Sequence, residues 1–238
     1  MGNSLNERKQ RLYRVNNVMF WVTLVSGVAY VVWLIIVGQR STVEVVFRGF
    51  QFVTMLLVLS FPVFVRRRLK RDLPIELYVL LILFCFASLV LGGGLDFYGR
   101  FPWLDTVLHF FSGLLLSMLA LWFMHVIMGK DEKYIYRNKH FLCLFVVMFS
   151  LGVGALWEMT EYVIDVILGT NLQQFILRKT GAIITPEDIP LCGQEALADT
   201  MKDLVIDLGS SLLVAVYVFI RHDKVLARYH EGTYSVNG

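Results

Sequence analysis

Long apolar runs alternate with short polar segments along the whole chain. Six runs are long enough to cross a bilayer as helices, which takes about 20 apolar residues each. They fall at about 17–37, 43–65, 75–94, 104–128, 140–168 and 199–220. The pattern predicts an all-α fold, a six-transmembrane-helix integral membrane bundle. We expect a single membrane domain over residues 1–238, with one long loop at 169–198 and a polar tail at 221–238.

Composition agrees with a membrane location. Hydrophobic residues make up 57% of the chain and charged residues 17%, and the net charge is +3. The mean hydropathy of +0.63 lies outside the range of ordinary soluble domains. The three cysteines form no disulfide framework or zinc spacing, and no nucleic-acid-binding motif is visible. These observations exclude a soluble disulfide scaffold and a nucleic-acid-binding protein.

The basic residues are distributed unequally between the two sides of the predicted bundle. Sixteen of the 22 Lys and Arg residues fall on the side that carries both termini. They are Arg8, Lys9, Arg11, Arg14, Arg66, Arg67, Arg68, Lys70, Arg71, Lys130, Lys133, Arg137, Lys139, Arg221, Lys224 and Arg228. Cytoplasmic loops are enriched in Lys and Arg, so this distribution predicts that both termini are cytoplasmic.

Acidic residues recur at helical spacing in three of the predicted spans. The fourth span carries Asp105 and His109, the fifth Glu158, Glu161 and Asp165, and the sixth Asp199, Asp203 and Asp207. A charge at the bilayer centre costs about 2.5–3.5 kcal/mol on insertion scales, so such side chains usually face the protein interior or a water-filled cavity. In the predicted topology all three stripes lie in the outer half of the membrane. We therefore expect a polar cup open to the outer leaflet.

One imidazole among several carboxylates suits a divalent metal ion. The expected metal ligands are Asp105, His109, Glu158, Glu161, Asp199 and Asp203, with Asp165 and Asp207 as secondary candidates. Catalytic candidates are His109, Glu161 and Asp203. Only Arg100, Arg178 and Lys202 lie near enough in the sequence pattern to balance the acids, so either a cation neutralises the cluster or several acids are protonated. The metal's identity stays open.

Structural interpretations compete with the metal site. The stripe of the fifth span can be a set of interfacial acids that bond the outer loop and only assist packing. Asp199 opens an apolar run before Thr200, as a helix N-cap does. A lone histidine near a helix end is commonly a packing residue, and only its pairing with Asp105 favours a ligand or proton-carrier role for His109.

The motifs resemble a known family. Asp105-Thr106-Val107-Leu108-His109-Phe110, then Glu158 and Glu161-Tyr162, then Asp199-Thr200 and Asp203-Leu204 are similar to the pattern of the YjdF-like family of uncharacterised bacterial inner-membrane proteins. A looser likeness is to the VanZ-like family associated with glycopeptide resistance. The resemblance covers roughly the C-terminal half, and the chain departs from it at Asp207 and in the long loop. It implies a bacterial plasma membrane location and a joint role for the His and acid positions.

Three functional hypotheses follow. The favoured one is a metal-dependent or acid–base activity on a lipid or cell-envelope substrate. The second is a cation or proton transporter that uses the same acidic cup, and the third is a non-catalytic envelope or assembly factor. Below the cup the helices are apolar, as in Leu114-Leu115-Leu116, which favours a binding or reaction site over a transport path. The sequence leaves open whether the chain is an enzyme, and its oligomeric state.

Overall fold

The computed structural model describes residues 2–36, 42–69, 73–94, 97–128, 138–177 and 184–222. Six helices in this part of the chain are long and apolar enough to cross a membrane. The all-α, multi-pass fold predicted from hydropathy is thereby confirmed. The chain forms two compact units, the first ending at Leu89 and the second beginning at Val90. The orientation of the termini stays a prediction.

The first unit is built from three consecutive helices. These are α1 (Gly2–Ile36), α2 (Thr42–Leu69) and α3 (Ile75–Cys85), and α3 continues without a break into the π-helix η1 (Phe86–Gly94). Many of their large apolar side chains are exposed, Val25 and Leu57 each by 66%. Such a surface would drive aggregation in water, but it matches the hydrocarbon of a bilayer. The exposed apolar faces therefore support a membrane-embedded unit.

A single buried amide joins the three helices of the first unit. Asn16 Nδ2 donates a hydrogen bond to the carbonyl oxygen of Leu59 at 3.0 Å. The hydroxyl of Tyr78 donates to Asn16 Oδ1. In an apolar bundle, interhelical hydrogen bonds of this kind fix which helix faces meet. Asn16 thus sets the register of α1 against α2 and α3.

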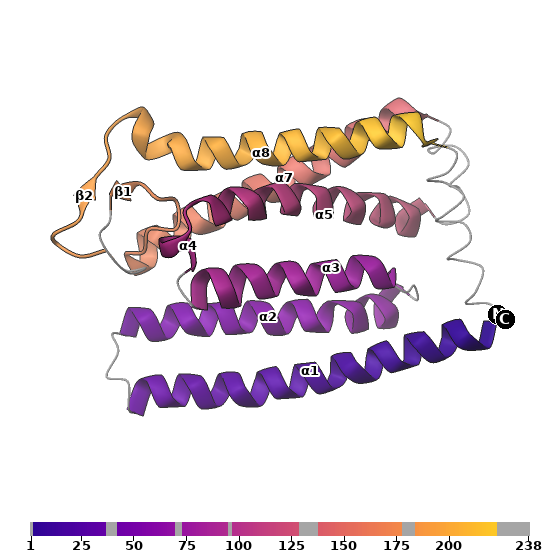
Figure 1. Cartoon of the computed structure of the whole chain (residues 1–238), viewed down its shortest axis with the longest axis horizontal. Helices are drawn as coiled ribbons and strands as arrows, with labels where there is room; N and C mark the ends of the chain where they lie inside the picture. The colour runs from indigo at the N-terminus through magenta and orange to yellow at the C-terminus, as the bar shows by residue number, and fades with distance from the viewer. Residues whose placement is uncertain are drawn as a thin grey trace. The chain divides into compact units, whose positions relative to one another are not determined.

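The second unit contains the helices that carry the acidic residues. The short helix α4 (Phe97–Arg100) precedes α5 (Trp103–Met128), α7 (Lys139–Leu168) and α8 (Gln194–Ile220). Helices α5, α7 and α8 pack against one another, side by side in Figure 1. Helices α5 and α8 begin at the same end at which α7 ends, beside two short strands (Figure 1). We call this the hairpin end of the unit.

Local sequence signals explain the helix boundaries. Asn138 caps α7, because its side-chain oxygen accepts a hydrogen bond from the Phe141 N–H at 3.2 Å. Gly169 ends α7 in a left-handed conformation with φ of 65°, which glycine adopts without strain. Gly193 precedes α8, which begins at Gln194 rather than near 199. The N-cap interpretation of Asp199 is therefore wrong, because good helix formers such as Glu195 extend the helix by a turn before the apolar run starts.

The connection between α7 and α8 folds into a small hairpin anchored by Asp165. Strands β1 (Ile176–Leu177) and β2 (Ile189–Pro190) pair antiparallel. Asp165 is buried, and its Oδ1 accepts hydrogen bonds from Thr170 Oγ1 at 2.6 Å and from the Leu172 N–H at 2.7 Å. Its Oδ2 accepts from the Gln173 N–H at 3.0 Å. One carboxylate therefore fixes the path of the chain as it leaves α7. Within the predicted loop, residues 178–183 lie outside the described residues, as does the predicted tail beyond residue 222.

Apolar packing holds the opposite end of the second unit. A buried cluster draws on all three long helices and comprises Ala120, Leu121, Met124, Leu142, Val146 and Val218. Ala120, Leu142, Val146 and Val218 are completely buried. The bundle is thus packed mainly by apolar side chains at one end and carries its acids toward the other.

Replacing Asp165 with alanine should release the start of the hairpin. Each charge-assisted hydrogen bond contributes about 1.5–3 kcal/mol, so the amides of Leu172 and Gln173 should exchange with solvent about 10–100-fold faster. Hydrogen exchange followed by mass spectrometry measures this directly. The control is Glu187→Ala, which removes an exposed acid of the same connection. Equal exchange at Leu172 in the two variants would contradict the anchoring role.

Candidate functional site

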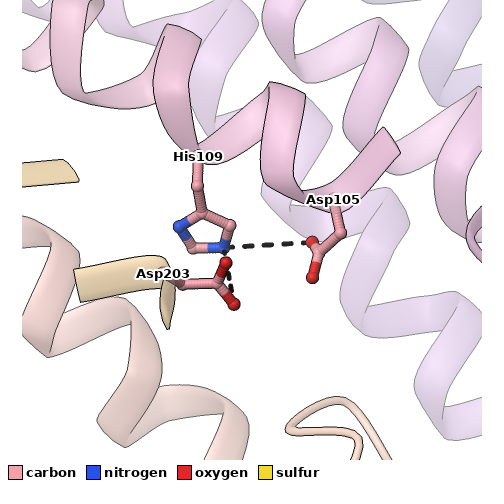
Figure 2. Close-up of side chains that lie close together, drawn as sticks. All are labelled: Asp105, His109 and Asp203. Carbon is pink, nitrogen blue, oxygen red and sulfur yellow. Dashed lines mark ion pairs between the residues drawn. The ribbon is translucent and has the colours of Figure 1, made fainter. Parts of the chain in front are cut away.

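His109 lies at the centre of a buried cluster formed by three helices. Its ring comes from the second turn of α5, and the residue is only 7% exposed. Nε2 lies 3.9 Å from Asp105 Oδ1 on the same helix and 3.9 Å from Asp203 Oδ2 on α8 (Figure 2). It also lies 3.8 Å from Glu158 Oε1 on α7. One ring nitrogen therefore faces a carboxylate from each helix of the bundle.

These distances have the dimensions of a small cation site. They exceed the N–H···O range of about 2.7–3.2 Å, so Nε2 makes no direct hydrogen bond to the three acids. Two ligands that each lie about 2.1 Å from one ion are at most about 4.2 Å apart, and the three distances from Nε2 fall within that limit. One ligand atom each from Asp105, His109 and Asp203 lie within 4.8 Å of one another. A small cation placed between them would contact all three with little movement.

Two buried oxygens of the cluster accept no hydrogen bond from the described residues. Glu158 and Asp203 are 4% and 2% exposed. Glu158 Oε1 and Asp203 Oδ1 are buried without a hydrogen-bond partner in the described part of the chain. Burying a polar atom without a partner is costly, and more so for a charged group. The cluster therefore contains carboxylate oxygens whose hydrogen-bonding capacity this part of the chain does not satisfy.

Negative charge exceeds positive charge around the cluster. The carboxylates near His109 are Asp105, Glu158, Glu161, Asp199, Asp203 and Asp207. Lys202 Nζ lies 3.4 Å from Asp199 Oδ1 and 3.9 Å from Asp203 Oδ1, on the half-exposed edge. Of the other predicted cations, Arg100 makes no ion pair with any described residue, and Arg178 lies outside the described residues. The imbalance favours a bound cation or retained protons.

The second ring nitrogen of His109 faces a different carboxylate. Nδ1 lies 3.4 Å from Asp207 Oδ2, and Asp207 is 1% exposed. Ser112 Oγ lies 2.7 Å from Asp207 Oδ1 and 2.7 Å from the His109 carbonyl oxygen, so its one proton is available to both. A Cβ at Gly154 would collide with the Asp207 carboxylate. Asp207 fits only because α7 carries glycine at the point of closest approach.

Comparison with known proteins places the chain in a family. A family model described as "Predicted membrane protein (DUF2238)" matches residues 19–224. The chain belongs to this family. The YjdF-like family suggested by the sequence motifs is this same family, so that prediction is confirmed. The likeness to the VanZ-like family stays a prediction. No curated protein and no solved structure matches the chain.

In this DUF2238 protein, some of the predicted metal ligands lie around His109 and others do not. The side chains of Asp105, Glu158 and Asp203 converge on His109 Nε2. Glu161 is half-buried and makes no hydrogen bond or ion pair within the described residues. The acidic stripe of the fifth span therefore divides between different roles.

Two other predicted ligands of the DUF2238 chain engage partners outside the pocket. Asp199 is half-buried and pairs with Lys202 one turn along α8. Asp165 uses both oxygens to hold the hairpin, as the structural interpretation of the stripe expects for that residue. We therefore leave Asp165 out of the proposed site.

Three polar residues of the DUF2238 chain contact the cluster without having been predicted. Gln174 Nε2 donates to Asp105 Oδ2 at 3.1 Å, from a left-handed backbone with φ of 48°. Gln173 Nε2 donates to the backbone carbonyl oxygen of Glu158 at 3.4 Å and to Thr200 Oγ1 at 3.0 Å. The glutamines sit in a loop, where no periodic pattern marks them. Ser112 had a usable signal, since it follows His109 by three residues on one helix face.

Substituting Gly154 should disturb the pocket through Asp207. Gly154→Ala introduces a Cβ where the Asp207 carboxylate lies, and overpacking of this kind costs about 1–3 kcal/mol. The matched control is Gly152→Ala on the same helix, where nothing lies within 4 Å and the change should stabilise the helix by about 0.5–1 kcal/mol. Thermal unfolding in detergent should give a lower midpoint for the first variant and an equal or higher midpoint for the second. Equal midpoints would mean that Gly154 is not a close-approach position.

Proposed function

We propose that this chain is a metal-dependent membrane enzyme of the bacterial plasma membrane that acts on a lipid or cell-envelope substrate. Asp105, His109 and Asp203 would hold one divalent cation, with Glu158 beside it. Both termini would be cytoplasmic, so the hairpin end would face outward. The supporting observation is that three helices each direct a carboxylate oxygen to 3.8–3.9 Å from His109 Nε2.

The donor set supports a hard or borderline cation. Three carboxylates and one imidazole suit Mn²⁺, Mg²⁺, Fe²⁺ or Zn²⁺ better than soft metals. Glu158 Oε1 and Asp203 Oδ1, which accept no hydrogen bond from the described residues, would supply ligand positions. A divalent ion bound there would polarise a substrate oxygen and activate a water molecule. It would also offset the excess negative charge of the cluster.

Glu161 is the carboxylate best suited to act as general base. It lies one turn from Glu158 on α7 and is free of hydrogen bonds and ion pairs to the other described residues. A base needs a carboxylate that is not already occupied, near the reacting atoms. In this proposal Glu158 assists metal binding and Glu161 moves the proton.

An amphipathic substrate fits the surroundings of the site. Aromatic residues gather where α5 begins: the Phe101 ring meets Phe97 edge to face at a centroid distance of 5.4 Å and lies tilted against Trp103 at 6.0 Å. Tryptophan and other aromatic side chains mark the level of the lipid headgroups. At 1.5 Å per residue, His109 lies about 9 Å along the helix from Trp103. A lipid headgroup or a lipid-linked envelope precursor would reach the cluster from that level.

Transport is the competing function, and the apolar end of the unit argues against it. A transport path would need polar side chains that continue past the cluster toward the other end of the three helices. Beyond Ser117 and Ser150, which both bond the Gly113 carbonyl, the helices meet in the fully buried apolar cluster that includes Ala120 and Val218. A hydrated ion would have to cross this predominantly apolar layer, beside which His125 is buried. The observations therefore favour a reaction site.

Metal binding gives the first test. Purified full-length protein, stripped with a chelator and dialysed against Mn²⁺, should bind about one ion per chain. Asp203→Asn and His109→Gln should each weaken binding by more than the roughly 10–100-fold expected for losing an outer-shell partner. Glu195→Gln, an exposed acid in the first turn of α8, is the control and should bind as the wild type does. A wild-type protein that retains no more Mn²⁺ than His109→Gln would refute the proposal.

Turnover gives the second test. The protein is reconstituted into vesicles of bacterial envelope lipids with Mn²⁺, and lipids and released products are analysed by mass spectrometry. The wild type should form a product that a chelator abolishes. Glu161→Gln should bind Mn²⁺ normally yet lose at least about 100-fold in rate, the low end of the contribution of general acid–base catalysis. Unchanged lipids with loaded wild-type protein, or Mn²⁺ uptake that Asp203→Asn abolishes, would contradict an enzyme.

A further inference from the structure

We propose that Asp207 is a positioning residue that fixes the proton of His109 on Nδ1 and so leaves Nε2 free to bind the cation. The inference rests on the proposed function, because a free Nε2 has a role only if a cation binds there. It also reassigns Asp207, which the acidic spacing alone suggested as a secondary metal ligand. Its basis is the geometry around the second ring nitrogen.

Both nitrogens of His109 face carboxylates, but at different distances. Nδ1 is 3.4 Å from Asp207 Oδ2, a contact that an N–H···O⁻ hydrogen bond shortens with little movement. Nε2 faces Asp105, Glu158 and Asp203 at 3.8–3.9 Å. A carboxylate only accepts, and the Asp207 contact at 3.4 Å is the one within hydrogen-bonding reach, so it favours the ring form with hydrogen on Nδ1. Metal-bound histidines in proteins almost always donate their other N–H to such a partner.

Asp207 is itself held from two sides. Ser112 Oγ lies 2.7 Å from Asp207 Oδ1, one turn of α5 below His109. On the other side, Gly154 of α7 leaves the space that the carboxylate fills. Gly113 gives comparable clearance to the Asp207 backbone and Ser210. Three helices therefore cooperate to place one carboxylate that lies behind the ring and away from the pocket.

This arrangement assigns distinct tasks to Asp203 and Asp207, which are one turn apart on α8. Asp203 Oδ2 is on the Nε2 side and Asp203 Oδ1 has no hydrogen-bond partner among the described residues. Both oxygens of Asp207 have partners, namely His109 and Ser112. Asp203 is thus available as a ligand, whereas Asp207 is already occupied.

The test reads the ring directly in metal-free protein. Nitrogen-15 NMR of full-length protein labelled at histidine, assigned with His109→Gln and recorded at alkaline pH, distinguishes the two neutral ring forms. The wild type should carry hydrogen on Nδ1, and Asp207→Ala should shift the ring to the Nε2–H form. Ser112→Ala should give a partial shift. Its matched control is Ser117→Ala, a serine of the same helix that bonds the Gly113 carbonyl and touches neither His109 nor Asp207.

Mn²⁺ binding supplies the second measurement. Asp207→Asn should weaken Mn²⁺ binding about 10–100-fold while the amount bound at saturation stays at one ion, because the ligands themselves remain. The inference is overturned if the ring of the wild type carries hydrogen on Nε2, or if Asp207→Ala leaves the ring form unchanged. A wild type that binds no Mn²⁺ but shows the expected ring forms would refute the metal proposal and support the positioning role of Asp207.

Discussion

Burial of several carboxylates around one imidazole, inside a bundle with an apolar exterior, is the constraint on which the second unit depends. His109 faces acids from α5, α7 and α8. The three helices must therefore align these residues at one depth, and each helix must be rotated about its axis so that its acid points to the imidazole. Carboxylates in such surroundings repel one another and lose their hydration. Lys202 compensates only at the half-exposed edge of the described cluster. In the proposed function a bound cation would resolve this conflict and would account for the convergence of the acids.

The rest of the unit supports that convergence. Small residues at Gly113 and Gly154 let the helix backbones approach closely, and Ser150 bonds a carbonyl of the neighbouring helix, which is how polar contacts join helices in membranes. The apolar cluster at the far end provides packing without polar cost. At the hairpin end, Asp165 orders the chain so that Gln174 reaches Asp105. Stability and the site thus draw on different parts of the same three helices.

Hydropathy alone predicted the helices, because a spanning run is long and its apolar character dominates every other signal. Helical spacing also placed Asp105 beside His109 and predicted that acids of separate spans would meet. Spacing could not separate the roles of acids within one stripe. Asp165 bonds the hairpin because of the path that the loop takes after α7. Asp207 faces the second ring nitrogen of His109 because Gly154 leaves space for its carboxylate. Apolar runs likewise missed the polar first turn of α8, because helix formers such as Glu195 extend a helix without adding to its hydropathy.

The most direct test of this account is where a metal ion binds. A crystal structure of the protein grown with Mn²⁺, with anomalous data collected at the manganese absorption edge, locates the ion without reference to any assumed site. The account predicts one peak about 2.0–2.2 Å from His109 Nε2 and from oxygens of Asp105 and Asp203. It also predicts that Nδ1 of the same ring faces Asp207. No peak among these residues in a manganese-saturated crystal, or acids turned away from one another, would contradict it.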